Sequence, residues 1–131
     1  MNRIRKTFSC CCLLLIGANF PTTYAAGVYD ISDEDFARYR AALAQSPSEY
    51  TVSVGDSLLA EGKANDDVRL MIAGSTLHEI NASARMDSTA IPFIQEVIKY
   101  NSLRVEREGW NIHTSYGFFA GYGDLITYQT I

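Results

Sequence analysis

The three cysteines of this 131-residue chain stand side by side, at Cys10, Cys11 and Cys12, at the start of an apolar stretch near the N-terminus. The rest of the sequence contains no cysteine, so a domain formed there has no disulfide, no thiol nucleophile and no cysteine-based zinc site. Such a domain depends on its hydrophobic core alone. The pattern favours a bacterial periplasmic or secreted protein over a small animal secreted protein.

Residues 1–25 have the three parts of a secretory signal peptide. Three of the first six residues are basic, and small residues surround a cleavage position after Ala25, with Gly27 as the alternative. The apolar run Phe8–Ala18 is about eleven residues long, whereas about twenty span a bilayer. The cysteines precede the leucines of that run, which disfavours lipid attachment. We therefore expect export to the periplasm or secretion, with no stable membrane anchor.

Removing 25 residues from the 131 leaves 106, enough for one small domain over residues 26–131. The whole chain has 11 basic and 15 acidic residues, and three basic residues leave with the leader, so the net charge becomes −7. This acidity disfavours nucleic acids and anionic membranes as partners, because both require a basic surface. Two interpretations stay open: the charge keeps the protein soluble, or an acidic face meets a basic partner.

Amphipathic patterns predict three main helices. The first begins at Ser32, an expected N-cap, and places Phe36, Tyr39 and Leu43 on one face before ending at residues 46–48. The second is the main buried helix, over about Asp66–Met86, and the third starts at residues 88–89 and ends at residues 101–102. Gly74 inside the second helix is expected to allow the close approach of a neighbouring element.

Two segments carry strand signals instead. Tyr50–Val54 alternates and is followed by the break Gly55–Asp56 and a brief helix to residue 62. From Trp110 to Phe118, apolar and polar residues alternate with a period of two, and turn residues at 121–124 precede a β-rich end. We expect an α+β fold, with about three helices packed against a small antiparallel sheet or C-terminal hairpin. An all-α fold, with a short helix through residues 116–120, is the alternative.

Aromatic residues crowd the same C-terminal segment. If one face of a hairpin packs on the helices, the other face exposes aromatics, and such surfaces often bind other proteins or carbohydrates. The competing interpretation is that both faces are covered, or that the segment is helical. The candidate binding residues are Trp110, Tyr116, Phe118, Phe119 and Tyr122.

Catalytic and metal motifs are weak in this sequence. His78-Glu79 lacks the second histidine that a zinc protease helix has four residues later, because position 82 is Ala82. His78, Glu79 and His113 could still converge in the fold, but the expectation is no metal and no cofactor. Carboxylates are numerous, but no spacing singles out a pair that could act as acid and base.

The stretch from Gly55 to Leu59, a polar break, and Ile72–Gly74 on a helix resembles small periplasmic immunity proteins that neutralise cell-wall-degrading effectors. Those proteins usually carry paired cysteines, which this chain lacks after its leader, so no residue role is transferred. We expect an exported, non-enzymatic protein-binding domain: an inhibitor, an immunity factor or an envelope-complex subunit. A small exported hydrolase that uses carboxylates or His78 and His113, and a secreted effector, are the alternatives.

Overall fold

The computed structural model describes residues 30–130, and all the regular secondary structure assigned among these residues is helical. The elements are α2 (Asp33–Ala44), α3 (Glu49–Asn65), α4 (Val68–Ser83), the 3-10 helix η1 (Ser88–Ala90), α5 (Ile91–Glu108) and α6 (Ile112–Gln129). The expected α+β fold is therefore wrong for this part of the chain, and the all-α alternative is correct. The expected leader, residues 1–25, lies outside the described residues.

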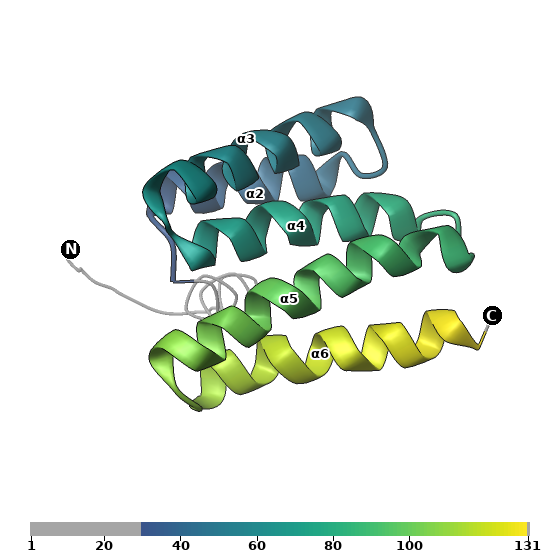
Figure 1. The fold of residues 1–131 in the computed structure, drawn as a ribbon. Helices are drawn as coiled ribbons and strands as arrows, with labels where there is room; N and C mark the ends of the chain where they lie inside the picture. The colour runs from purple at the N-terminus through teal and green to yellow at the C-terminus, as the bar shows by residue number, and fades with distance from the viewer. Residues whose placement is uncertain (1–29, 131) are drawn as a thin grey trace, which may run out of the picture.

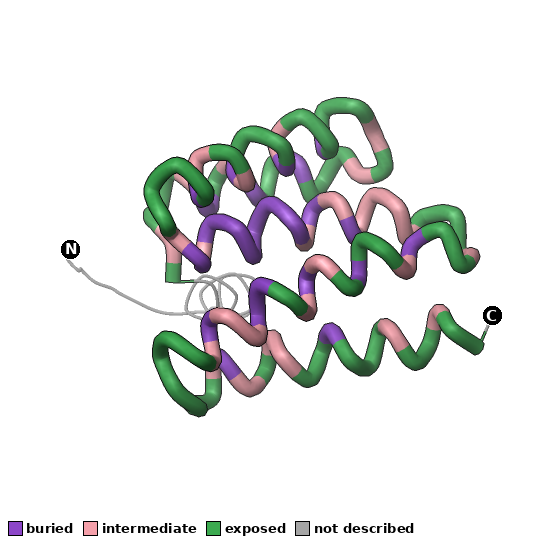
Figure 2. The backbone as a smooth tube through the Cα atoms, viewed as in Figure 1, coloured by how far each residue is buried: buried purple, intermediate pink, exposed green. Residues whose placement is uncertain are grey.

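Consecutive helices run antiparallel, with α4 in the middle of the bundle (Figure 1). Helices α2 and α3 cover one side of α4, α5 packs on the other side, and α6 packs on α5 and η1. Burial is densest along α4 and sparse along α6, the helix at the edge (Figure 2). The core clusters follow this order: one joins α2, α3 and α4 around Leu58 and Leu77, and the other joins α4 and α5 around Ile72 and Tyr100.

Helix α2 starts as the sequence predicts. The side chain of Ser32 accepts a hydrogen bond from the backbone N–H of Asp35, and Phe36 and Tyr39 are buried. Leu43, the third residue of the expected stripe, is exposed, and Ala42 faces the core instead. The prediction of the helix and of its first two core residues is confirmed.

The expected strand Tyr50–Val54 and the break after it are both wrong, because one continuous helix, α3, covers them. Ser48 caps α3 by accepting a hydrogen bond from the N–H of Thr51 at 3.2 Å. The buried residues of α3 then recur at spacings of four and three: Thr51, Gly55, Leu58 and Gly62. Packing of this narrow stripe against α4 outweighs the strand propensity of the β-branched residues.

Glycines allow α3 and α4 to approach closely. A Cβ atom on Gly74 of α4 would lie 2.7 Å from the carbonyl oxygen of Gly55 and 2.7 Å from the backbone nitrogen of Leu59. A Cβ on Gly62 would lie 2.8 Å from the backbone nitrogen of Met71. The expectation that Gly74 permits a close neighbour is confirmed, and α4 itself lies within the expected range.

The third expected helix and the C-terminal hairpin both require correction. Helix α5 continues to Glu108, well past residues 101–102, since Asn101 and Arg104 are themselves buried on its inner face. The segment expected to form a hairpin is helix α6, which begins with a capping box between Asn111 and Thr114. Alternation with a period of two misled here because Gly117, which takes a polar position in the alternation, is a position that the helix uses to contact α5.

We predict that Gly74→Ala destabilises the domain, since the added methyl group meets backbone atoms of α3 that cannot move alone. Overpacking of this kind typically costs about 1–3 kcal/mol, which thermal unfolding followed by circular dichroism would detect.

Gly123→Ala is the matched control, because a Cβ at Gly123 meets nothing within 4 Å. Alanine favours a helix over glycine by about 1 kcal/mol, so this variant should unfold at a higher temperature. Equal effects of the two substitutions would contradict the close contact between α3 and α4.

Candidate protein-binding surface

Four of the five candidate binding residues form one aromatic cluster, which lies between the α5–α6 turn and the middle of α6. We define the aromatic cluster as Trp110, Phe118, Phe119 and Tyr122. The ring of Phe118 lies 5.2 Å from that of Trp110, 5.3 Å from Phe119 and 4.9 Å from Tyr122, measured between centroids. These are ordinary distances for interacting aromatic pairs, so the rings hold one another in place.

The side of α6 that faces away from α5 is apolar and open. We define the outer face of α6 as Ile112, Tyr116, Phe119 and Ile126, which follow at spacings of four, three and seven. Ile112 is 69 % exposed, Phe119 63 % and Ile126 63 %, and a shallow groove runs over the first half of this face. The helix exposes apolar side chains because α5 and η1 cover only its inner side.

The inner face of α6 explains why so much of the outer face is free. Gly117 and Gly121 lie against Asn101 and Ile98 of α5, and a Cβ on Gly121 would lie 2.9 Å from Cγ1 of Ile98. Thr114 and Gly121 are the buried residues of α6. Small residues therefore attach the helix to α5, and the large ones point elsewhere.

The structure does not bring His78 and His113 together. His78, in the second half of α4, lines a small cavity of α3, α4 and α5 residues, and its Nε2 lies 2.9 Å from Oδ1 of Asp56 without the direction of a hydrogen bond. His113 is in the first turn of α6, at the end of the bundle where α4 begins (Figure 1). At 1.5 Å per residue, the ten residues from Val68 to His78 place His78 about 15 Å along α4 from that end.

Glu79 lines a different cavity, between α4, α5 and α6, so the convergence of His78, Glu79 and His113 that the sequence left open does not occur. Within residues 30–130, no group of three histidine or acidic side chains could hold a metal ion.

Two carboxylates that the sequence did not single out as a pair share the cavity between α4, α5 and α6. Its volume is about 250 Å³, and Glu79 and Asp124 both line it. Glu79 is only 8 % exposed, and burial raises the pKa of its carboxyl group, with a further increase from the charge of Asp124. Asp124 is itself exposed, and the partial burial of its carboxyl group raises the pKa of that group. The hydroxyl of Ser83 donates a hydrogen bond to Glu79 at 3.1 Å, which opposes part of the effect on Glu79.

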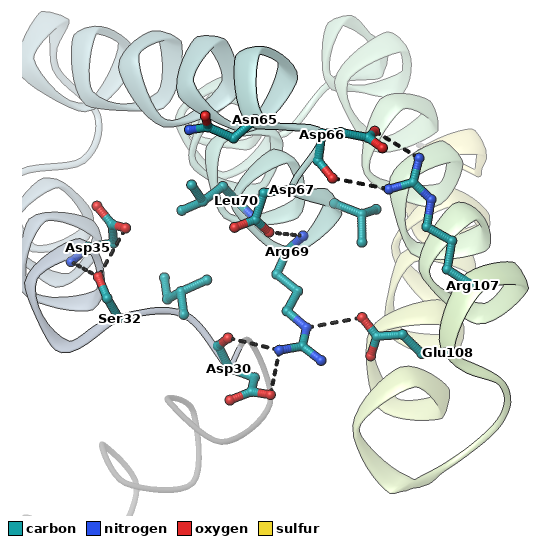
Figure 3. Close-up of a pocket in the computed structure, with 12 residues that line it drawn as sticks. Asp30, Ser32, Asp35, Asn65, Asp66, Asp67, Arg69, Leu70, Arg107 and Glu108 are labelled. Carbon is teal, nitrogen blue, oxygen red and sulfur yellow. Dashed lines mark hydrogen bonds and ion pairs between the residues drawn. The ribbon is translucent and has the colours of Figure 1, made fainter.

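Charged residues also surround a larger pocket of about 480 Å³ where α2, α4 and α5 meet (Figure 3). Here the charges pair with one another: Arg69 contacts Asp30 at 2.6 Å and Glu108 at 3.0 Å, while Arg107 contacts Asp66 at 2.9 Å. The hydrogen bond from Arg69 is the main reason that the pKa of Glu108 is lowered. This network connects the start of the described chain with the first turn of α4 and the last turn of α5.

Comparisons with known proteins find no match to this chain among family models, curated proteins or solved structures. Among the described residues, no helix combines the length and the apolar character needed to cross a membrane.

Sequence reasoning selected the aromatic residues but missed the two-carboxylate cavity. Asp124 was interpreted as a turn residue, and Glu79 only as a neighbour of His78. A helical interpretation of α6 could have placed Asp124 at the cavity, because Gly117, Gly121 and Asp124 follow one another at spacings of four and three residues, on one face of a helix. An α6 helix that places its glycines against α5 puts Asp124 beside that contact, on the side of α4.

We predict that Glu79→Gln raises the melting temperature at pH 7, because the raised pKa means that the folded state disfavours the ionised form. For a carboxyl whose pKa is raised on folding, the unfolding free energy falls as the pH rises from the ordinary carboxyl range toward neutrality. Melting curves from pH 4 to pH 8 should therefore decline less steeply for the variant, with a gain of about 4 °C at pH 7 if roughly 1 kcal/mol is recovered.

Glu106→Gln removes the same charge from an exposed position of α5 and serves as the control. It should leave the unfolding free energy at pH 7 within about 0.5 kcal/mol of the original. If Glu79→Gln lowers the melting temperature at pH 7, the ionised carboxylate stabilises the fold, which contradicts a raised pKa of Glu79.

Proposed function

We propose that this chain is an exported protein-binding domain that captures another protein on the outer face of α6. Exposure of that face is the observation that carries the proposal. The helix shows apolar side chains on both sides, and helices of that kind are normally covered on both sides. The uncovered side is therefore suited to a partner.

The size of the exposed surface supports a protein as the occupant. An aromatic side chain offers about 150–250 Å², so the exposed parts of the outer face and Trp110 (59 % exposed) amount to roughly 600–700 Å². A stable interface buries about 800 Å² on each partner. A partner that covers this face and some of its rim reaches that size.

Charge supports a partner with basic groups around an apolar centre. Helix α6 contains one acidic residue, Asp124, and no lysine or arginine. The whole chain carries a net charge of −4 with its leader and −7 without it. An apolar centre would supply the binding energy, and the surrounding acidity would favour basic partners and speed their association. Inhibitors, immunity factors and envelope-complex subunits are the classes to which such a protein would belong.

The double variant Tyr116→Ser/Phe119→Ser tests the proposal. We expect it to remain helical by circular dichroism, since both side chains are exposed, and to lose most of the partner that the unmodified chain retains from an envelope extract. The measurement is quantitative mass spectrometry of the captured proteins, and the loss should be at least tenfold, or about 1.4 kcal/mol.

Leu43→Ser/Tyr50→Ser is the matched control, because it removes two exposed apolar side chains from α2 and α3, away from α6. This control should capture the same partner in undiminished amount. Retention of the partner by the α6 variant, or an equal loss in the control, would contradict binding through the outer face.

A further inference from the structure

The bundle itself does not require a glycine at position 123. A Cβ atom on Gly123 would meet nothing within 4 Å, whereas Gly117 and Gly121 lie against α5. Among residues 30–130, Gly109 is the glycine with a positive φ angle, so the backbone at Gly123 does not require glycine either. A glycine inside a helix costs about 1 kcal/mol relative to alanine. The missing side chain at Gly123 therefore suits a contact from outside the bundle.

Gly123 belongs to a longer stripe along α6, the helix at the edge of the bundle (Figure 1). We define the α6 stripe as six exposed residues at spacings of four, three, four, three and four: Ile112, Tyr116, Phe119, Gly123, Ile126 and Thr130. This is the a and d spacing of a coiled coil, which keeps one face of a helix turned toward a second helix. At 3.6 residues per turn, the stripe lies opposite Gly121, on the side of α6 that faces away from α5.

We propose that the outer face of α6, when no other partner covers it, binds the same face of a second copy of this chain, as an antiparallel pair of helices. The inference goes beyond the proposed function and does not rest on it, because it concerns what covers the face before a partner is captured.

The α6 stripe has the same spacing in both directions, and this symmetry favours an antiparallel pair. A two-fold axis halfway between Phe119 and Gly123 places Phe119 of one copy opposite Gly123 of the second copy, and the reverse. The ring of Phe119 then fills the space that Gly123 leaves open. A parallel pair would instead place Phe119 against Phe119 and leave a gap between the two glycines. The same two-fold axis forms two further kinds of pair: Tyr116 with Ile126, and Ile112 with Thr130.

The ring of Phe119 is held in place before a second copy arrives. It stacks on the ring of Trp110 at 5.9 Å and meets the ring of Phe118 at 5.3 Å, measured between centroids. A side chain that its neighbours already fix loses little conformational freedom on association, which lowers the cost of binding. The aromatic cluster therefore supplies a rigid side chain to the centre of the pair.

The outer face of α6 lets two acidic copies meet without bringing like charges into contact. All six residues of the α6 stripe are uncharged, and the acidic residue of α6, Asp124, lines the cavity on the inner side. Each copy without its leader carries a net charge of −7, so repulsion at longer range remains. Salt should therefore strengthen the pair by screening this repulsion, whereas salt weakens a complex with a basic partner.

The area of the face fits a weak, reversible dimer. Each copy offers roughly 600–700 Å² of exposed apolar surface there, so a symmetric pair buries about 1,200–1,400 Å² in total. Specific protein interfaces begin at about 1,200 Å² in total. The pair is therefore expected to dissociate in the micromolar range, and a partner that also covers the rim would displace the second copy.

Sedimentation equilibrium tests the pairing on the chain from Ala26 onward, which contains every described residue. Between about 1 μM and about 500 μM the chain should pass from monomer to dimer and form nothing larger, because a two-fold pair is closed. Raising the NaCl concentration from about 50 mM to about 500 mM should increase the dimer fraction. A chain that stays monomeric, that forms a series of larger species or that dissociates in salt would overturn the inference.

Gly123→Gln fills the gap that Phe119 of the second copy requires, and it should weaken association at least tenfold. Glutamine favours a helix over glycine, and the space around Gly123 is open, so this variant should unfold at a higher temperature when both chains are monomeric. A loss of the dimer is then not a loss of structure.

Ala60→Gln is the matched control, because it adds the same side chain at an exposed position of α3. It should leave association unchanged. Unchanged association of Gly123→Gln, or an equal loss in Ala60→Gln, would contradict pairing through the α6 stripe.

Isotope-filtered NMR on a mixture of labelled and unlabelled chains determines the register of the pair directly. Intermolecular NOEs should connect the ring protons of Phe119 with the α protons of Gly123. Contacts of Phe119 with Phe119 alone would indicate a parallel pair, and contacts outside α6 would indicate another interface. Either result would overturn the inference.

The dimer and the proposed function fail separately. If the chain stays monomeric while capture still depends on Tyr116 and Phe119, the face serves another protein alone, and the dimer is wrong. If Gly123→Gln dissociates the dimer while Tyr116→Ser/Phe119→Ser still captures its partner, the dimer stands and the proposed docking face of that partner is wrong.

Discussion

The fold depends on the close approach of α3 and α4 through glycine. The described residues include no cysteine, so no disulfide supports their packing, and Gly55, Gly62 and Gly74 let two helix backbones come together where side chains would keep them apart. That contact fixes α4 in the middle of the bundle. With α4 fixed, α5 has one free side on which to pack, and α6 then packs mainly on α5, with smaller contacts to η1. The exposure of the last helix is thus a consequence of the order in which the helices fill the space around α4.

The sequence predicted the helices that have large apolar residues at helical spacing and missed those that pack through small ones. The start of α2 and the whole of α4 were predictable because Phe36, Tyr39 and the apolar residues of α4 recur every three or four positions. Helix α3 was not, since its buried positions include Gly55 and Gly62, which are usually taken as breaks. The end of α5 was missed because its inner face there is polar, with Arg104 buried.

The candidate site was predictable in composition and not in arrangement. Trp110 and Phe119 could be selected because aromatic residues concentrate near the C-terminus, but their contact with each other followed only from the helical structure of α6, which begins just after Trp110. The pairing of Glu79 with Asp124 joins residues 45 positions apart, and neither residue is part of a motif. Such a pair depends on how α6 is rotated against α5, and two glycines set that rotation.

Oxidative footprinting of the aromatic side chains tests the central claim most directly. Hydroxyl radicals label exposed Trp110, Tyr116 and Phe119, and mass spectrometry reads the labelling in the free chain and in the complex recovered from envelope extract. Tyr50, exposed on α3, is the internal reference. Binding through the outer face of α6 predicts that the complex protects the three α6-side residues and leaves Tyr50 unchanged. Unaltered labelling of all three, or protection of Tyr50 alone, would contradict the account.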